Sequence, residues 1–506
     1  MTESLPVDGS SLNLEQFLAV VRGRSTVEPT AEALVAVRAG RAAVERALAS
    51  GRAVYGVTTG FGALASTPVG AARARELQLN LVRSHACGTG PPLPAEVVRG
   101  LLLLRLNSLC RGLSGVRPDL VRMLAECLNR GVVPWVPEQG SVGASGDLAP
   151  LAHLALALVG EGSCLDRTGG ERPARQELSA AGLAPLALAE KEGVALINGT
   201  ALMTSYLALG VADGQELLAA AESAAAMSFD ALGGSLEPLD DQVHSARGLP
   251  EQAQVAARMR ERLAGSALTS PVGQARAQDP YTLRAIPPVF GASVLALEWA
   301  EQVLASELNA VSDNPLVLPG DLFLSGANFH GQPLALALDT LALGLQYLAG
   351  FSERRISRLL HPALNGGLPA FLSPEPGAHS GYMIAQYLAS ALVLENAGLV
   401  HPASALSLPT SADQEDFNSE GARAGAKLRR LIENARRVIA VEWLVAGQAL
   451  ELRRPKTGGK GSEAALRALR SLVPSLERDR PLAPEIEQVA DAIADGSLLR
   501  RLRAQR

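Results

Sequence analysis

Long stretches of this sequence repeat apolar residues at steps of three and four, the periodicity of a helix with one buried face. The run AEVVRGLLLLRLNSLCRGL at 95–113 is an example. Further long helices are expected at about 200–228, 290–311, 332–360, 380–399 and 421–453. Helices this long and apolar must bury against one another, so we expect a mainly α fold around a central bundle of long helices.

Two segments interrupt the helical pattern. Residues 162–188 are rich in Gly and Pro, which predicts a loop or hairpin between lobes, and residues 401–420 form a polar loop before a helix. With 506 residues the chain exceeds what one simple core usually organises. We expect an N-terminal lobe over 1–200 and a long-helix bundle with C-terminal helices over 201–506.

Composition excludes several classes of partner. Hydrophobic residues make up 47% and charged residues 19%, which is typical of a well-buried globular protein. The net charge is −5 and no Lys/Arg tract is present, so neither nucleic acid nor an anionic membrane is an expected partner. The most apolar windows carry Asp339 and Gln346, which favours buried helices over membrane spans.

The cysteines favour a reducing compartment. Cys87, Cys110, Cys127 and Cys164 form no C-x-x-C pair and have no His at zinc-ligand spacing, so no metal site is expected. So few cysteines in a long chain make a disulfide framework improbable. The N-terminus MTESLPVDGSS also lacks the pattern of a signal peptide. We therefore expect a cytoplasmic protein.

The segment GSVGASGDLAP at 140–150 places Ala144-Ser145-Gly146 just before an apolar helix. A turn with a helix cap is the ordinary interpretation of such a triplet, and Asp147 is expected to cap the helix. The alternative is a backbone that reacts with itself, the amide nitrogen of Gly146 attacking the carbonyl carbon of Ala144. Gly146 lacks the Cβ that would restrict this approach. Ser145 supplies a hydroxyl that can leave as water.

Other polar or Gly-rich segments also break the apolar background, and each alone is a weak signal. They are YGVTTGFG (55–62), NLVRSHACGTG (80–90), LINGT (196–200), AQDPYTLR (277–284), SGANFHGQP (325–333) and TSADQEDFNS (410–419). Together and in this order they resemble the aromatic amino acid ammonia-lyases and aminomutases, most closely the histidine-type members. The resemblance runs from about residue 12 to about residue 500. It implies the fumarase/aspartase-like helical architecture, with the reactive triplet in the N-terminal lobe.

The resemblance implies a cofactor made from the chain itself. In this family Ala144-Ser145-Gly146 would cyclise without help into 4-methylideneimidazole-5-one (MIO), so no external cofactor is expected. An ammonium group is a poor leaving group, and no ordinary side chain is an electrophile. Covalent bonding of the substrate amine to such a group solves the leaving-group problem.

The same resemblance assigns the residues that act on the substrate. Tyr55 would be the base that removes the β-proton, and Gly56, Gly60 and Gly62 after it predict a mobile lid. Alone, this tyrosine would be interpreted as packed beside a glycine turn. Asn198 would hydrogen-bond near the electrophile or the substrate.

A second group of residues is assigned in the same way. Arg284 would bind the substrate carboxylate through its planar two-pronged donor. Tyr281 and Gln278 precede it at steps of three, so the three would share one face on a helix. Phe329 would pack against the electrophilic ring. The segment Asp313-Asn314-Pro315 is expected to support the site structurally.

Substrate choice is predicted from Ser84-His85 and Glu415. Histidine-type members carry this Ser-His pair, and His85 can exchange a hydrogen bond with an imidazole ring, whereas a Leu there would favour a phenyl ring. Glu415 could hold an imidazolium or take a proton from the substrate ammonium. Phe417 in QEDFNS departs from the histidine type and resembles the phenylalanine type.

The expected activity is deamination of L-histidine to urocanate and ammonia, in histidine catabolism, by a homotetramer whose active sites draw on several subunits. The first alternative is a 2,3-aminomutase, which returns the amine to the β-carbon. The second is a tyrosine or phenylalanine ammonia-lyase. The third is a catalytically inactive helical scaffold of the same fold.

Overall fold

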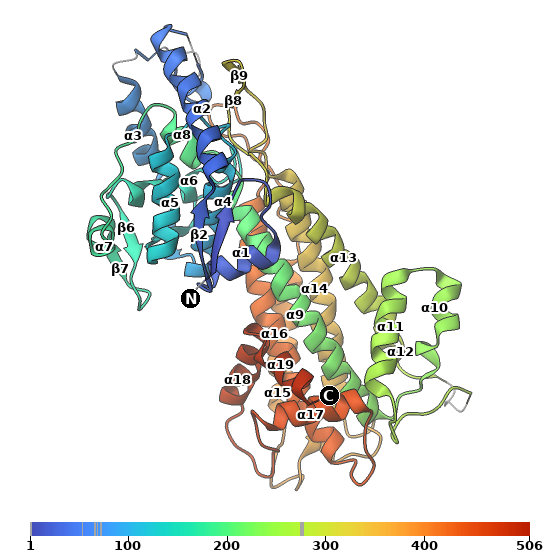
Figure 1. Ribbon diagram of the computed structural model, residues 1–506. Helices are drawn as coiled ribbons and strands as arrows, with labels where there is room; N and C mark the ends of the chain where they lie inside the picture. The colour runs from blue at the N-terminus through green and yellow to red at the C-terminus, as the bar shows by residue number, and fades with distance from the viewer. Residues whose placement is uncertain are drawn as a thin grey trace. The chain divides into compact units, whose positions relative to one another are not determined.

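The computed structural model describes residues 3–52, 54–64, 67, 69–70, 73–273 and 278–505. Within them the chain is mainly helical and its strands are short (Figure 1). The chain forms two compact units, each built from segments far apart in the sequence. The first comprises Met1–Leu209, Glu301–Asp339 and Pro402–Ala426, and the second comprises Gly210–Ala300, Thr340–His401 and Lys427–Arg506. The domain division expected at residue 200 stays a prediction.

The first unit is organised around the helix α4. Its helices are α1 (Leu14–Val21), α2 (Ala31–Ala49), α3 (Ala74–His85), α4 (Ala95–Cys110), α5 (Pro118–Arg130), α6 (Leu148–Leu158), α7 (Ala174–Ala180) and α8 (Glu192–Ile197). Helix α4 is buried along almost its whole length and packs against α1, α2 and α5. Helix α3 packs against α6 and α8, and α6 packs against α8. This second group of helices carries much of the candidate site.

Short strand pairs tie the loops of the first unit together. β1 (Glu3–Val7) pairs in parallel with β2 (Ser25–Pro29), with Glu3 opposite Ser25. The antiparallel pairings join β3 (Thr89–Pro92) with β5 (Pro137–Gln139), β4 (Val133–Pro134) with β6 (Ser163–Leu165), β6 with β7 (Glu171–Pro173), and β8 (Leu316–Leu318) with β9 (Leu322–Leu324).

The strands β6 and β7 confirm the hairpin predicted in residues 162–188. Two details of that prediction were wrong. Helix α7 follows the hairpin, and the whole segment lies inside the first unit rather than between lobes. The hairpin belongs to the first unit because its strand β6 pairs with β4 of that unit.

The long helices expected from apolar periodicity are present. They are α9 (Ala201–Leu232), α13 (Ile286–Glu307), α14 (Gln332–Leu360), α15 (Met383–Leu399) and α16 (Gly421–Glu451). The polar loop predicted before the last of them is also present, since residues 402–420 contain no helix. Among the described residues, α14 alone is long and apolar enough to span a membrane, and 61% of its most apolar window is buried.

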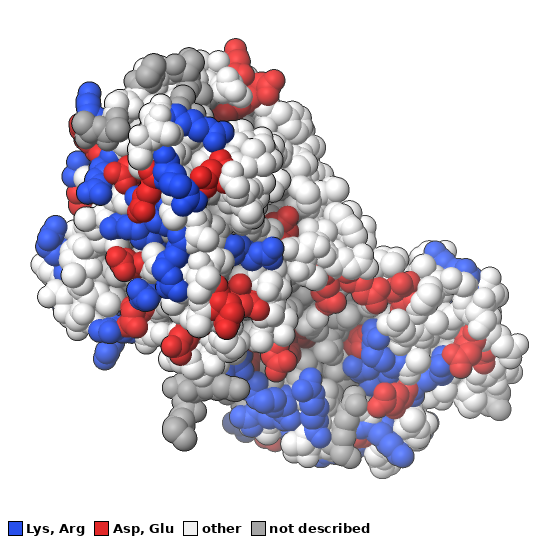
Figure 2. Space-filling model, turned by 45° about the horizontal axis from the view of Figure 1, so that its top comes forward, with Lys and Arg blue, Asp and Glu red and all other residues white. Residues whose placement is uncertain are grey.

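The second unit adds shorter helices, which are α10 (Asp241–Arg247), α11 (Pro250–Leu263), α12 (Tyr281–Arg284), α17 (Lys460–Arg470), α18 (Ala483–Ala494) and α19 (Ser497–Ala504). Helix α17 packs against α11 and α19. A fully buried ion pair between Arg355 and Glu442, 2.5 Å long, joins α14 to α16 within this unit. Figure 2 shows Lys and Arg mixed with Asp and Glu over much of the visible face, as the small net charge predicts.

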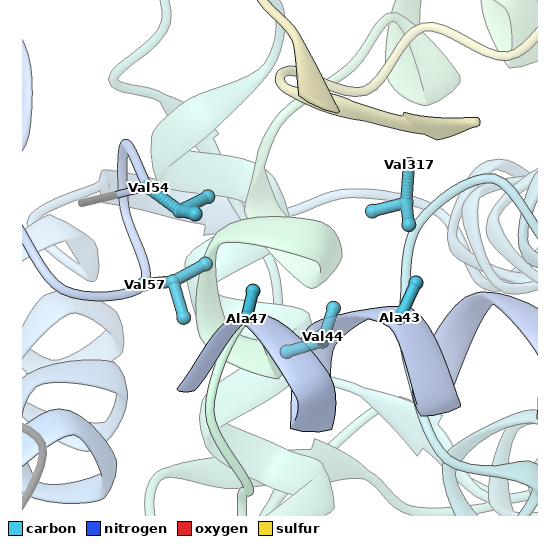
Figure 3. Packing of buried hydrophobic residues seen from close by; sticks show 6 residues of the cluster. All are labelled: Ala43, Val44, Ala47, Val54, Val57 and Val317. Atoms are coloured by element: carbon cyan, nitrogen blue, oxygen red, sulfur yellow. The ribbon is translucent and has the colours of Figure 1, made fainter. Parts of the chain in front are cut away.

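A small apolar cluster holds the segment after α2 in place. Ala43, Val44 and Ala47 on α2 pack with Val317 of β8 and with Val54 and Val57 of that segment (Figure 3). Val54 and Val57 are 4% and 1% exposed. Burying two valines is worth a few kcal/mol, so the backbone between them is fixed against α2. Tyr55 lies between these two anchors.

Candidate active site

The backbone of the Ala-Ser-Gly triplet packs closely against Gly199, in the segment that precedes α9. Gly146 has a φ of 78°, in the left-handed region that favours glycine. A Cβ on Gly146 would lie 2.2 Å from the carbonyl oxygen of Gly199. That same oxygen accepts a hydrogen bond from the amide of Asp147, at 2.8 Å. Gly146 is therefore required both by its conformation and by the close approach of Gly199.

Asp147 caps a different helix from the one predicted. Its side chain makes no capping bond to α6, which it precedes. Instead Oδ2 accepts from the backbone amides of Leu202 and Met203, at 2.8 and 3.2 Å, in the first turn of α9. The side chain is fully buried, and this burial raises the pKa of Asp147 to about 7. The hydrogen bonds from the two amides act in the opposite direction and lower the pKa. Asp147 thus fastens the triplet to the start of α9.

Ser145 contacts Glu415 directly. The Ser145 hydroxyl donates to Oε1 of Glu415 at 3.1 Å, and the Thr410 hydroxyl donates to Oε2 at 3.1 Å. Both carboxylate oxygens are therefore held, one by the triplet and one from within the loop of residues 402–420. Charge-assisted bonds of this kind are among the stronger hydrogen bonds.

The loop that carries Glu415 is hydrogen-bonded to the loop that carries Ser145. The amide of Glu420 donates to the carbonyl of Val142 at 3.0 Å, and the Ser419 hydroxyl donates to the carbonyl of Gly143 at 3.2 Å. A Cβ on Gly143 would lie 2.2 Å from that hydroxyl oxygen, so this position also needs glycine. These contacts set the distance between the two loops.

Tyr55 faces the same cavity from the segment after α2. Its phenol oxygen accepts a hydrogen bond from the amide of Gly62 at 3.2 Å, and its ring meets Phe61 edge-on at 6.2 Å between centroids. The carbonyl of Gly56 accepts from the side-chain amide of Gln78, a fully buried residue on α3. The predicted mobility of this lid stays a prediction.

His85 is the last residue of α3 and its hydrogen bonds indicate one tautomer. Nδ1 lies 2.9 Å from the carbonyl oxygen of Leu81, which can only accept, so Nδ1 carries the proton. In the neutral ring Nε2 is then left as an acceptor. Burial lowers the pKa of His85, opposed by the bond to Leu81 and by the charge of Glu415.

Asn198 directly follows α8 and is 5% exposed. Its side-chain Oδ1 is buried and has no hydrogen-bond partner among the residues that the structure describes. A buried amide oxygen without a partner costs on the order of 1–3 kcal/mol. Asn198 also lines the larger cavity of the site.

One cavity of about 670 Å³ brings five of the predicted residues together. They are Tyr55, His85, Ser145, Asn198 and Glu415. Apolar side chains complete the lining, among them Leu77, Leu81, Leu148, Val194 and Ile197. A smaller cavity of about 230 Å³ is lined by Ala144 and Gly146, and it shares His85 and Glu415 with the first. The two sides of the triplet therefore line two adjacent cavities.

Sequence reasoning missed three polar residues beside the site. Asn80 and Ser411 line the larger cavity, and Thr410 bonds Glu415. Asn80 lies one helical turn before Ser84 on α3, so helical spacing could have found it. No local signal distinguishes Thr410 and Ser411 from the other polar residues of their loop.

Four predicted residues line neither of these two cavities. Gln278, Tyr281 and Arg284 belong to the second unit, and Phe329 lies half-buried in the turn after β9 of the first. The Arg284 guanidinium stacks over the Tyr281 ring at 4.5 Å, and Tyr281 is 70% exposed. Gln278 does not share a helical face with Tyr281 and Arg284, because α12 begins only at Tyr281. Pro280 at the helix N-terminus explains this start.

Within the described residues, no group of three or more His, Cys, Asp or Glu side chains could hold a metal ion.

The sequence matches the profile of a known family. The profile, described as "Aromatic amino acid lyase", matches residues 12–471. The chain belongs to this family. It is 48% identical to the histidine ammonia-lyase of Geobacillus thermodenitrificans over 95% of each chain. It is also 48% identical to the histidine ammonia-lyase of Deinococcus radiodurans, over 97% of this chain and 93% of the other.

Solved structures of this lyase family share the fold. A tyrosine aminomutase from Streptomyces globisporus superposes with a TM-score of 0.94 at 39% identity, over 99% of both chains. A histidine ammonia-lyase from Trypanosoma cruzi superposes with a TM-score of 0.91 at 39% identity, over 99% of this chain and 95% of the other. The predicted family and mainly α fold class are confirmed, and the chain is a carbon–nitrogen ammonia-lyase.

Proposed function

We propose that this lyase acts on L-histidine and releases ammonia and urocanate. The observation that carries the proposal is the contact of Ser145 with Glu415 in a cavity that His85 and Tyr55 also line. Relatives at 48% identity over nearly the whole chain are named histidine ammonia-lyases, which supports the same reaction.

We further propose that Ala144-Ser145-Gly146 becomes the MIO group. The residues fit this group, because Gly146 occupies a backbone position that a Cβ could not enter and Ser145 faces the larger cavity. When formed, the group supplies an electrophile for the substrate amine, so no external cofactor is needed. Asp147 and Gly199 hold the backbone on which it would form.

The surroundings of Tyr55 support its proposed role as the base. Its phenol oxygen accepts a hydrogen bond from the Gly62 amide, and the side chain lines the same cavity as Ser145. Val54 and Val57 limit how far the tyrosine can move from α2. Asn198 lines the same cavity, and its side-chain amide would hydrogen-bond the substrate or the reacting group.

The substrate ring is recognised by His85 and Glu415. Nε2 of His85 accepts a hydrogen bond, and an imidazole N–H is a donor that would satisfy it. Glu415 can accept from the second imidazole nitrogen or from the substrate ammonium, or hold an imidazolium. A phenyl ring offers no donor to either group and would leave both unsatisfied. The site would therefore bind phenylalanine less well than histidine.

The predicted residues outside the two cavities would complete the site through assembly. We propose a homotetramer in which Gln278, Tyr281, Arg284 and Phe329 face active sites shared between copies. Helix α15 supports self-association, because Ile384, Tyr387 and Leu394 are 62, 62 and 73% exposed. Exposed apolar faces of this kind mark interfaces. Arg284 would bind the substrate carboxylate, and Phe329 would pack against the reactive ring. We place the enzyme in the cytoplasm, with no nucleic acid or membrane partner.

The test is a spectrophotometric assay of the purified protein with L-histidine, with Ser145→Ala as control. We expect growth of the near-ultraviolet absorbance of a conjugated acrylate with the wild type only. Mass spectrometry of the peptide containing residues 144–146 should show the loss of two water molecules in the wild type and not in the variant. No absorbance with histidine would contradict the proposed substrate. A β-amino product from histidine, tyrosine or phenylalanine would identify an aminomutase instead.

A further inference from the structure

Arg105 is a buried cation whose hydrogen bonds all lead to the candidate site. It lies on α4 and is 1% exposed. Nη1 donates to the carbonyl of Asn198 at 3.0 Å, and Nη2 donates to the carbonyl of Ala195. Both acceptors lie at the C-terminal end of α8, where carbonyls have no partner within the helix. The guanidinium therefore closes this end of α8.

The positive charge of Arg105 is offset by nearby carboxylates, but no carboxylate of the described residues forms an ion pair with it. Asp313 and Asp147 both act on Arg105 electrostatically, and Asp313 forms its own buried ion pair with Lys191, 2.8 Å long. The Nε of Arg105 has no partner within the described part of the chain. A buried guanidinium is costly, and here its directed donors are used on two backbone carbonyls. Such an arrangement fixes backbone geometry.

The peptide that Arg105 holds is the one against which the reactive triplet rests. A Cβ on Gly199 would lie 2.4 Å from Nη1 of Arg105, so the guanidinium touches one side of this residue. The Gly199 carbonyl accepts the amide of Asp147, and Gly146 approaches it closely. The segment of Asn198 and Gly199 is thus held between Arg105 and the triplet.

We propose that Arg105 is a positioning residue that sets how the Asn198 side chain enters the cavity. This inference rests on the proposed function, in which Asn198 touches the substrate or the reacting group. Arg105 does not itself line either cavity among the described residues, so it acts through the backbone of Asn198. A planar guanidinium fork fixes the directions of both donors, whereas a lysine ammonium is a compact charge on a flexible stem and holds two carbonyls less rigidly.

Arg99 offers a matched control on the same helix. Its guanidinium also donates to backbone carbonyls, those of Val20, Val21 and Leu128, which lie on α1 and α5. Arg99 lines neither site cavity within the described lining. Replacing either arginine by lysine removes a fork of donors from α4, and only Arg105 leads to Asn198.

The experiment compares Arg105→Lys with Arg99→Lys in kcat, KM and thermal midpoint. We expect Arg105→Lys to lower kcat roughly tenfold to a hundredfold, the effect of a misplacement of about 1 Å, with KM changed much less. Arg99→Lys should lower the thermal midpoint and leave kcat within about twofold, as a purely structural contact would. Mass spectrometry of the 144–146 peptide separates a defect in cyclisation from a misplaced Asn198.

A double-mutant cycle with Asn198→Ala decides whether the effect passes through Asn198. If it does, Arg105→Lys will lower kcat far less in the Asn198→Ala background than in the wild type. Additive effects, or an unchanged kcat in Arg105→Lys, would overturn the proposal. So would loss of folding in both Arg105→Lys and Arg105→Gln while Arg99→Lys folds. Wild-type turnover of histidine is measured separately, so failure of the proposed function is distinguishable.

Discussion

The hydroxyl of Ser145 donates to a carboxylate oxygen of Glu415 at 3.1 Å, although 270 residues separate the two in the sequence. The contact joins the reactive triplet to the residue assigned to the substrate. It is fixed from both sides, since Thr410 holds the other carboxylate oxygen and the two loops bond through Val142 and Glu420. In the proposed function the Ser145 oxygen leaves when the MIO group forms, and the Glu415 carboxylate would then face the substrate amine.

Removing the charge of Glu415 should weaken catalysis with histidine. Glu415→Gln keeps the size and one acceptor oxygen but loses a charge-assisted bond, worth roughly 1.5–3 kcal/mol. We expect kcat/KM for L-histidine to fall roughly tenfold to a hundredfold in a steady-state assay. Asp413→Asn, in the same loop and exposed, is the control and should behave as the wild type. Equal activity of both variants would contradict the role of Glu415.

Replacing His85 should change the preferred substrate. His85→Leu removes the Nε2 acceptor and adds apolar surface to a cavity already lined by Leu77, Leu81 and Leu148. We expect kcat/KM for histidine to fall by at least roughly tenfold, while the ratio of phenylalanine to histidine turnover rises. The measurement is a competition between the two amino acids, read as cinnamate and urocanate. A variant that keeps its preference for histidine would show that the ring is recognised elsewhere.

A methyl group on Gly146 should prevent the triplet from packing against Gly199 as it does in the structure. In Gly146→Ala the new Cβ lies 2.2 Å from the Gly199 oxygen, in addition to the strain of a positive φ. Gly131→Ala isolates that strain, because Gly131 has a φ of 72° and nothing within 4 Å of its Cβ position. We expect a clearly larger drop in thermal midpoint for Gly146→Ala, with no activity. Similar midpoints would argue against the close approach.

Asp147 should make stability depend on pH in a defined direction. Its folded-state pKa is raised from 3.8 to about 7, so the folded chain keeps a proton that the unfolded chain loses. The stability from this group is therefore present at low pH and is lost as pH rises from about 4 to about 7. Asp147→Asn keeps an oxygen for the α9 amides and removes the titration.

We expect the urea midpoint of the wild type, relative to Asp147→Asn, to decrease over this pH window and to stay constant above it. The opposite slope, or no change in the difference between the two proteins, would mean that Asp147 is ionised in the folded state throughout.

The helices were predictable from the sequence because their signal is local. The spacing of apolar residues alone placed the long helices near their observed positions, and the order of the polar segments identified the family. The types of the residues Ala144, Ser145 and Gly146 alone favoured a turn with a helix cap, and the prediction that this triplet reacts came from the resemblance to the family. Tyr55, His85, Asn198 and Glu415 could be assigned from the segments that carry them, and they share one cavity with Ser145.

The tertiary structure decided which distant groups meet. Asp147 precedes α6, and the sequence therefore predicted that it caps α6, but its carboxylate caps α9 because the triplet folds onto Gly199. The close approach of Gly146 to Gly199, the Thr410 bond to Glu415 and the hold of Arg105 on Asn198 join segments that only packing brings together. Local periodicity and residue type determine helices and candidate chemistry. Contacts between residues far apart depend on how the helices pack, which no local pattern records.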